Sequence, residues 1–423
     1  MKQAAPYMAA ASCEQRNAAL RAAADALSAN ADRIFEANRR DIEAAEAAGI
    51  SEAIKKRLKF DEKKLEGAVN GIEQLISLPD PVGRVTLNRQ LDEGLVLKRV
   101  TCPIGVIGVI FEARPDALVQ VSSLCIKSGN CAILKGGRET ANSNRVLFEI
   151  IHEAAAAAGL PRECLLQAQQ HSEIDELLKC YESVDLLIPR GSNAFVQYIM
   201  DNTKIPVMGH ADGICHTYAD EISDIDKAVR IIIDAKTQYT AACNATETLL
   251  VKRSTAPVLL PELKKALDSA AVKVRATDEA AAGMSVAGAQ DIEIITDDEF
   301  SKEYLDLILG VKLVDGVDEA IDHINRYGSH HTDCIISDNE NNIEKFFKLV
   351  DSAGVYANCS TRFADGFRYG FGAEVGISTG KIHARGPVGL DGLVTYKYEL
   401  TGNGHIVDDY AAGRAQFNFR ELN

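Results

Sequence analysis

The stretch Val106-Ile107-Gly108-Val109-Ile110-Phe111 is a continuous apolar run, typical of a strand that is buried on both faces of a parallel sheet. Residues 116–127 follow with a helical pattern that ends at Gly129, and Cys131–Lys135 predicts a second strand. The alternation continues with a helix over 142–158 and strands over 164–166 and 184–188. It predicts an α/β fold built on a doubly wound, nucleotide-binding sheet.

The pattern changes on either side of this sheet. Residues 1–80 have the apolar spacing of helices, and Val85–Leu87 with Leu95–Val100 predict a hairpin around the turn Asp92-Glu93-Gly94. A second alternating unit follows residue 243, with helices predicted over 262–271, 317–326 and 342–351 and strands over 292–295, 334–336 and 355–358. A tail strand is predicted over 393–400. A chain of 423 residues is expected to fold as two large domains.

The charge and the cysteines limit the class of protein. Sixty-one acidic against 46 basic residues give a formal net charge of −15, which repels nucleic acid and anionic membrane surfaces. An anionic substrate must therefore be held by a local group of basic side chains and backbone N–H groups. No stretch has transmembrane length, and the ten cysteines include no Cys-x-x-Cys pair, which favours reduced thiols without structural zinc. We expect a cytoplasmic protein with no nucleic-acid or membrane partner.

Two strand ends carry residues suited to cofactor phosphates. Lys135-Gly136-Gly137-Arg138 follows one strand, and Pro189-Arg190-Gly191-Ser192 follows another and opens a helix. Unpaired N–H groups at such strand ends and helix N-termini bind phosphates. The Gly-x-Gly-x-x-Gly fingerprint is absent, so ordinary tight turns remain an equal interpretation.

The stretch from Tyr239 to Thr248 contains the strongest candidate nucleophile. Cys243 lies among small residues, beside Asn244 and just ahead of the apolar run Leu249-Leu250-Val251. Its thiolate has little bulk to shield it, and the amide of Asn244 can hydrogen-bond to a group that is bonded to the sulfur. The alternative is a buried cysteine that acts as a small apolar residue, which this stretch alone does not exclude.

The stretch Ser329-His330-His331-Thr332-Asp333 suggests a metal site only at first sight. Adjacent histidines point in different directions on a strand or loop, and no third ligand stands at useful spacing. The sequence therefore favours a surface loop or a substrate contact, and we expect no metal.

Six stretches together resemble the gamma-glutamyl phosphate reductases, a family of the aldehyde dehydrogenase superfamily. They keep their order along the chain and are Cys102–Pro115, Leu134–Gly137, Gly209–His216, Ala242–Leu250, Glu319–Asp333 (without His330) and His383–Pro387. The resemblance implies an NADP-binding domain (residues 1–82 and 103–234, with 378–393), a catalytic domain (235–377) and a β flap for oligomerisation (83–102 and 394–423). It also implies a homodimer or homotetramer and a possible contact with glutamate 5-kinase.

The reaction implied by this resemblance is the reduction of L-glutamyl 5-phosphate by NADPH to L-glutamate 5-semialdehyde and phosphate, the second step of proline biosynthesis. Cys243, with Asn244, would be catalytic and would form a thioacyl enzyme. The implied cofactor-binding residues are Lys135, Gly136, Arg138, Pro189, Arg190, Gly191 and Ser192, and the implied substrate-binding residues are Arg114, His210, His331 and Arg385.

The chain departs from hydrolytic aldehyde dehydrogenases at two places. Those enzymes have an asparagine where this chain has Ala113-Arg114, so Arg114 is free to hold the substrate phosphate. They also carry a glutamate base that activates water, and our pairing places His210 or its neighbours there. Three alternatives stay open at this point: an aldehyde dehydrogenase of another acyl class, a thiol hydrolase or transferase, and a scaffold without activity.

Overall fold

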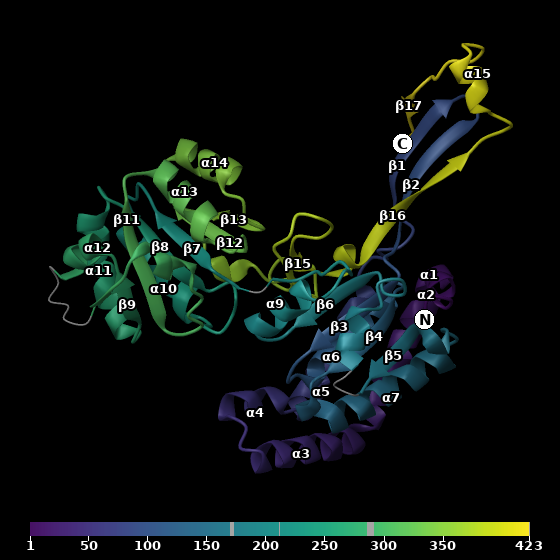
Figure 1. The fold of residues 1–423 in the computed structure, drawn as a ribbon, viewed down its shortest axis with the longest axis horizontal. Coiled ribbons are helices and arrows are strands. Elements are labelled where there is room, and N and C mark those ends of the chain that lie inside the picture. Colours follow the sequence, from purple (N-terminus) through teal and green to yellow (C-terminus); the bar gives the residue numbers. More distant parts are fainter. Residues whose placement is uncertain (170–172, 211, 286–291, 423) are drawn as a thin grey trace. The chain divides into compact units, whose positions relative to one another are not determined.

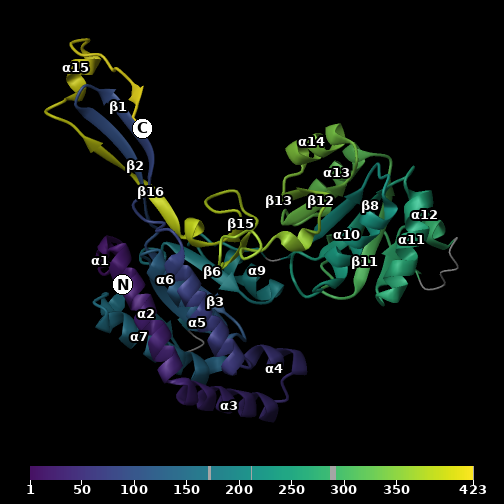
Figure 2. The same cartoon turned by 180° about the vertical axis from the view of Figure 1, so that it is seen from behind.

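The computed structural model describes residues 1–169, 173–210, 212–285 and 292–422, and Figures 1 and 2 show it from opposite sides. Ala211 of the Gly209–His216 motif and Asn423 of the expected flap lie outside the described residues. The chain divides into two compact units. The first comprises Met1–Met208, Phe371–Gly376 and Val388–Asn423, and the second comprises Gly209–Gly370 and Ile377–Pro387.

The first unit contains a four-stranded parallel sheet in the order β5-β4-β3-β6. Its strands are β3 (Val106–Phe111), β4 (Cys131–Gly136), β5 (Leu165–Ala168) and β6 (Leu186–Arg190). Its helices are α1 (Ala5–Ala10), α2 (Cys13–Ala29), α3 (Ala31–Ala47), α4 (Glu52–Leu58), α5 (Glu62–Ser77), α6 (Pro115–Lys127), α7 (Ala141–Ala157), α8 (Glu173–Leu178) and α9 (Asn193–Asp201). All six residues of β3 are buried, as the opening stretch predicts.

Helix α3 fixes the start of α7 and hence the loop that follows β4. Asp41 of α3 is buried and accepts hydrogen bonds from the backbone N–H groups of Asn142 (3.0 Å) and Ser143 (2.8 Å). A carboxylate stabilises the free N–H groups and the positive end of the helix dipole at an N-terminus. The loop from Gly136 to Thr140 is therefore held between a buried strand and a helix that is anchored at its first turn.

The second unit contains a seven-stranded parallel sheet in the order β10-β9-β11-β8-β7-β12-β13. Its strands are β7 (Cys215–Ala219), β8 (Thr246–Lys252), β9 (Lys273–Ala276), β10 (Ile292–Ile294), β11 (Ile308–Val314), β12 (Thr332–Ile336) and β13 (Gly354–Ala357). Its helices are α10 (Ile225–Thr237), α11 (Ala256–Ser269), α12 (Asp278–Ser285), α13 (Val317–Tyr327) and α14 (Glu340–Leu349). Short 3-10 turns, η1 (Arg138–Thr140) to η5 (Leu390–Leu393), join elements in both units.

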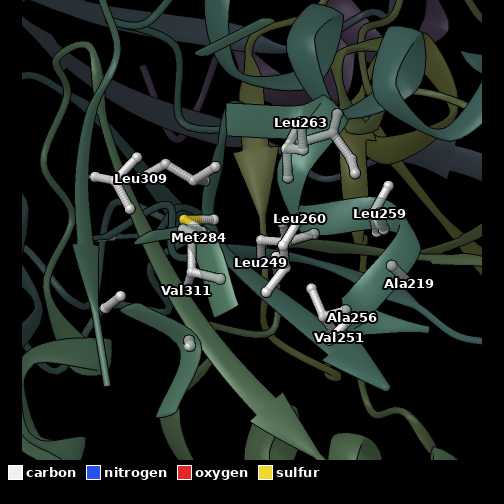
Figure 3. Packing of buried hydrophobic residues seen from close by; sticks show 14 of the residues in the cluster. Ala219, Leu249, Val251, Ala256, Leu259, Leu260, Leu263, Met284, Leu309 and Val311 are labelled. Carbon is white, nitrogen blue, oxygen red and sulfur yellow. The ribbon is translucent and has the colours of Figure 1, made fainter. Parts of the chain in front are cut away.

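The two faces of this sheet carry separate apolar cores. Leu249 of β8 packs with α10, α11 and α12, whereas its neighbour Leu250 packs with α13 and α14. Successive side chains of a strand point to opposite faces, so the buried run at 249–251 serves both cores. Figure 3 shows part of the first core, where side chains of β8 and β11 meet those of α11 and Met284 of α12. This is the three-layer α/β arrangement that the sequence predicts.

The observed division differs from the expected domain bounds. The sequence places residues 209–234 with the cofactor domain, but β7 pairs with β8 and β12, and α10 packs on the same sheet. Residues 377–387 also belong to the second unit, whereas 388–393 stay with the first. The short strands β14 (Gly376–Ser378) and β15 (Gly386–Val388) pair with each other where the chain passes between the units. Helix α11 also begins earlier than expected, because Pro261 is accommodated inside it.

A separate four-stranded sheet unites the expected hairpin and the tail. Its order is β16-β2-β1-β17, with β1 (Val85–Asp92), β2 (Leu95–Pro103), β16 (Val394–Thr401) and β17 (Arg420–Glu421). β16 pairs antiparallel with β2 over eight residue pairs, from Val394↔Pro103 to Thr401↔Val96. The short helix α15 (Val407–Ala411) lies between β16 and β17. None of the helices in the described ranges is long and apolar enough to cross a bilayer.

Candidate active site and cofactor site

Cys243 lies in the loop between α10 and β8, where small residues bring other chain segments close to it. The sulfur lies 3.1 Å from Nε2 of His331, and the side chain is half-buried. A Cβ atom at Gly213 would meet the carbonyl oxygen of Cys243 at 2.2 Å and its Cα at 2.4 Å, so only glycine fits there. Cys243 is thus a partly accessible thiol against an imidazole, and not a cysteine that merely fills an apolar core.

Two histidines border this thiol. His331 directly precedes β12 and is 1% exposed, and its Nδ1 lies 2.9 Å from the hydroxyl oxygen of Thr332. His210 has its Nδ1 3.0 Å from the carbonyl oxygen of Ile377, and its ring lies edge-on to that of His331 with the centroids 5.0 Å apart. The fold therefore brings together three residues that the sequence identified separately: His210, Cys243 and His331.

Asn244 is buried (4% exposed) and braces the loop. Its Nδ2 donates a hydrogen bond to the carbonyl oxygen of Ala364 at 2.8 Å, while its Oδ1 is buried without a partner among the described residues. One amide N–H is therefore already used to hold the segment that follows η4 (Thr361–Phe363). In this structure, Asn244 therefore holds the cysteine loop against the segment 361–364.

Arg362 is a neighbour of the cysteine loop that sequence reasoning missed. It lies in η4, is 7% exposed, and its Nε donates to Oε1 of Gln238 at 3.0 Å. Arg368 donates from Nη1 to the carbonyl oxygen of Arg362 at 2.8 Å, which places a second guanidinium nearby. Burial, and then the charge of Arg368, lower the pKa of Arg362, whereas Cys243 raises it. Among the described residues, no carboxylate forms an ion pair with this buried cation.

No local sequence pattern could have identified Arg362. It follows β13, far from Cys243 along the chain, and reaches the cysteine loop only because β13 and β8 belong to one sheet. Gln238 lies before Cys243 in the chain, and Asn244 follows it. Arg362 hydrogen-bonds to Gln238, and Ala364 to Asn244, so the segment 361–364 contacts the cysteine loop at both places. The guanidinium of Arg362 is therefore hydrogen-bonded to the loop that carries Cys243.

A buried ion pair closes the base of the same loop. Lys236 at the end of α10 donates from Nζ to Oε2 of Glu247 in β8 at 2.7 Å, and both side chains are at most 1% exposed. Burial raises the pKa of Glu247 to about 7 and lowers the pKa of Lys236, in each case against the attraction of the partner. The backbone N–H of Leu305 also donates to Glu247 at 3.3 Å.

Arg385 and Arg114 occupy different surroundings from these residues. Arg385 donates from Nη2 to the backbone carbonyl (3.2 Å) and the carboxylate (3.1 Å) of Asp351, so its charge is already paired. Arg114 is exposed and precedes α6 in the first unit, whereas Cys243 belongs to the second.

A second candidate site is a cavity of about 220 Å³ in the first unit. It lies at the carboxyl ends of β3 and β4, where nucleotides bind in open α/β sheets. The residues that line it are Ile110, Phe111, Glu112, Lys135, Gly136, Gly137, Arg138, Glu139, Ile174 and Phe195. Three predicted cofactor-binding residues, Lys135, Gly136 and Arg138, therefore share one cavity.

The other predicted strand end lies beside this cavity without lining it. Gly191 passes close to Glu112, whose carboxylate a Cβ atom would meet at 2.5 Å. Glu112 accepts a hydrogen bond from the backbone N–H of Ser192 at 2.9 Å, at the start of α9. Arg190 donates to Gln120 at 3.3 Å, and Pro189 lies within β6. The N-terminus of α9 therefore already has a carboxylate partner, Glu112, in its own unit.

Two acidic residues of the cavity were missing from the sequence prediction. Glu112 follows β3 directly, and Glu139 follows Arg138 in η1. Glu139 accepts a hydrogen bond at 2.6 Å from the backbone N–H of Ala113, which adopts a left-handed conformation (φ 49°). Burial lowers the pKa of Lys135, while Glu173 and Glu139 oppose that effect. The cavity thus contains cations and carboxylates together.

Comparison with known proteins agrees with this geometry. A profile of the aldehyde dehydrogenase family matches residues 1–296. Gamma-glutamyl phosphate reductase of Ruminiclostridium cellulolyticum is 55% identical over 416 residues, which are 98% of this chain and 95% of that protein. The crystal structure of gamma-glutamyl phosphate reductase from Thermotoga maritima has a TM-score of 0.92 at 38% identity and covers 96% of this chain and 97% of that chain. A propionaldehyde dehydrogenase from Clostridium phytofermentans shares the fold at 16% identity, with a TM-score of 0.63 over 94% of each chain.

Proposed function

Because the chain belongs to the gamma-glutamyl phosphate reductases of the aldehyde dehydrogenase family, we propose that it reduces L-glutamyl 5-phosphate with NADPH. The products are L-glutamate 5-semialdehyde and phosphate, as in the second step of proline biosynthesis. The observation that carries the proposal is the contact of 3.1 Å between Cys243 and His331, in a loop whose surroundings keep the thiol partly accessible.

The first chemical step is acylation of Cys243. Nε2 of His331 is within hydrogen-bond distance of the thiol and can take its proton, and Nδ1 lies 2.9 Å from the hydroxyl oxygen of Thr332. The thiolate then attacks the acyl carbon, a carbon–sulfur bond forms, and the carbon–oxygen bond to phosphate breaks. The result is a thioester on Cys243 and free phosphate. The protonated His331 lies next to the sulfur and can return the proton when the thioester has been reduced.

The cavity in the first unit is suited to hold NADPH. Gly136 and Gly137 line the cavity at the end of β4, and Lys135 and Arg138 add positive charge there. NADPH, when bound, supplies the hydride that reduces the thioester. Arg138 favours a cofactor that carries a 2′-phosphate, whereas Glu139 in the same cavity is suited to ribose hydroxyl groups.

Arg362 supports the choice of an acyl phosphate over a simple aldehyde as the partner of the thiol. It is a buried guanidinium without an ion-pair partner among the described residues, and it hydrogen-bonds to Gln238 of the Cys243 loop. The neighbouring Arg368 is paired with Asp365 at 3.7 Å, so Arg362 is the cation that is left to bind an anion. A site of this kind attracts an anion, and a guanidinium binds phosphate with paired hydrogen bonds. We assign Arg362 to the phosphate group, in place of or together with the predicted Arg114.

The test of the function is the reverse reaction. With semialdehyde and NADP held fixed, the rate of NADPH formation should rise from near zero and saturate as inorganic phosphate is added, because phosphate must release the acyl group from Cys243. A full rate without phosphate, with free glutamate as the product, would make the chain a hydrolytic aldehyde dehydrogenase.

The same assay separates the two arginines. Arg362→Gln should raise the KM for phosphate roughly 10- to 100-fold, since a hydrogen bond to a charged group contributes about 1.5–3 kcal/mol. The matched control is Arg253→Gln, which removes an exposed arginine that pairs with Asp315 in the same unit. If Arg114→Gln raises the KM for phosphate and Arg362→Gln does not, then Arg114, and not Arg362, binds the phosphate group.

A further inference from the structure

We propose that His210, Cys243 and His331 form a binding site for Zn²⁺, and that the bound ion blocks the thiolate reversibly. One ligand atom from each residue lies within 4.8 Å of the other two, so a single ion can contact all three. The sequence offered no third ligand near His330 and His331. The fold provides two, because the segment before β7 and the loop before β8 meet beside His331.

The histidines are oriented as metal ligands are. The carbonyl oxygen of Ile377 can only accept, so Nδ1 of His210, at 3.0 Å, carries the hydrogen and Nε2 keeps its lone pair. Nδ1 of His331 lies 2.9 Å from Thr332, and its Nε2 faces the sulfur of Cys243. Histidine ligands of zinc usually bind the ion through one nitrogen and donate a hydrogen bond to oxygen from the other.

The chemistry of the three donors selects the ion. One sulfur and two imidazole nitrogens are borderline-soft ligands that suit Zn²⁺, whereas Ca²⁺ and Mg²⁺ require oxygen. Three protein ligands leave a fourth tetrahedral position for water or for an anion. His331 is held by burial, and Gly213 allows the segment that carries His210 to lie against Cys243, so the three donors are already close together.

Binding changes the state of the thiol without a redox step. The sulfur–hydrogen bond of Cys243 is broken, the proton passes to solvent, and the sulfur lone pair forms a bond to Zn²⁺. A sulfur that is bound in this way cannot attack an acyl carbon, nor can it be alkylated at its usual rate. The ion is therefore an inhibitor and a protecting group for this thiol. Its binding does not depend on the reaction proposed above.

Co²⁺ is the probe for the site, because zinc itself has no visible spectrum. The full chain, titrated with Co²⁺ in the absence of substrate, should show one equivalent of a thiolate-to-metal charge-transfer band together with tetrahedral d–d bands, and Zn²⁺ should displace both. Cys243→Ser should abolish the charge-transfer band. His210→Ala and His331→Ala should each weaken binding at least about tenfold, as loss of groups that orient a metal already does.

Cys359→Ser is the matched control. Cys359 is half-buried, and its carbonyl oxygen lies 3.0 Å from Sγ of Cys334, so two sulfurs lie close together there and could also take the ion. The control should keep the full band. A band that survives Cys243→Ser, or equal affinity in the two histidine variants and the unchanged chain, would overturn the proposal.

The consequence for the thiol is measured separately. Zn²⁺ should slow the labelling of Cys243 by iodoacetamide, and a chelator should restore the rate. If the spectrum forms but the phosphate-dependent reaction does not occur, the proposed function fails and the metal site stands. If the reaction occurs and no cobalt–thiolate band forms, the metal site fails alone.

Discussion

Nζ of Lys236 lies 2.7 Å from Oε2 of Glu247, so the loop that carries Cys243 begins and ends at one buried ion pair. Both side chains are shielded from solvent, and a charge that is left there without its partner is costly. The ion pair therefore holds the two ends of the loop together.

Breaking this pair from one side should destabilise the second unit. Lys236→Met or Glu247→Gln is expected to lower the free energy of unfolding by about 3–5 kcal/mol, whereas the double variant Lys236→Met/Glu247→Leu should lose much less. Denaturant unfolding measures both. Lys265→Met, which breaks the exposed pair with Glu262, should change stability by less than about 1 kcal/mol. Additive losses in the double variant would show that the two residues act independently.

Cys243→Ala should abolish phosphate-dependent NADPH formation and leave the circular dichroism spectrum unchanged, because only the sulfur is removed. His331→Gln should keep a residual rate and lower kcat roughly 10²- to 10⁴-fold, the range for loss of a general base. Cys180→Ala removes an exposed cysteine of the first unit and is the control. Normal turnover by Cys243→Ala would end the covalent mechanism.

The sheet of the first unit followed from local sequence, whereas β7, β9 and β11 of the second sheet were not predicted. Continuous apolar runs such as 106–111 and 249–251 predict buried parallel strands, because both faces of each strand are covered. The boundary between the units could not be found in this way. β7 has the pattern of any strand in the chain, and only its pairing with β8 and β12 assigns it to the second sheet.

Only those parts of the candidate site that have a local sequence signal were predicted. Cys243 has an unusual local setting, and its resemblance to a known family is local as well. Arg362 and Lys236 have no such signal, since their importance comes from burial and from partners that the fold supplies. His331 was identified as a substrate contact, but its distance to the sulfur exists only in three dimensions.

Arg138→Glu should weaken NADPH binding more than NADH binding, because a carboxylate repels the 2′-phosphate that a guanidinium attracts. The cavity already contains Glu112 and Glu139, which enlarges the repulsion. Fluorescence titration with each cofactor measures the two dissociation constants. Arg145→Glu makes the same change of charge on the exposed face of α7 and should leave the ratio unaltered. Equal losses for both cofactors in Arg138→Glu would remove Arg138 from this role.

His323 should make the protein sensitive to acid. It is buried among Phe300, Tyr327 and His216, both of its ring nitrogens lack partners among the described residues, and burial lowers its pKa from 6.5 to about 2. Below pH 6.5 the unfolded chain binds a proton that the folded chain does not. The stabilising contribution is therefore complete above pH 6.5 and is lost as the pH falls toward 2.

His323→Phe tests this dependence. The variant keeps an aromatic ring and removes the titration, so the free energy of unfolding should fall less steeply below pH 6.5, by up to about 1.4 kcal/mol per pH unit. Unfolding curves at pH 5, 6 and 7 measure the slope. Identical slopes for the unchanged chain and His323→Phe would contradict the assignment.

The sheet β16-β2-β1-β17, which corresponds to the expected flap, should hold copies of the chain together. Tyr396, Tyr398 and Leu400 alternate along β16 and are more than half exposed, so they form an apolar row on one face of an edge strand. Tyr398→Lys with Leu400→Lys keeps the strand and disrupts that row, and deletion of 394–423 removes it. Light scattering at micromolar concentration should give a multiple of 45.7 kDa for the unchanged chain and a lower mass for both variants. Ile382→Lys, at an apolar residue of the second unit that is 94% exposed, should leave the mass unchanged. A mass of 45.7 kDa for the unchanged chain would show that the flap does not assemble it.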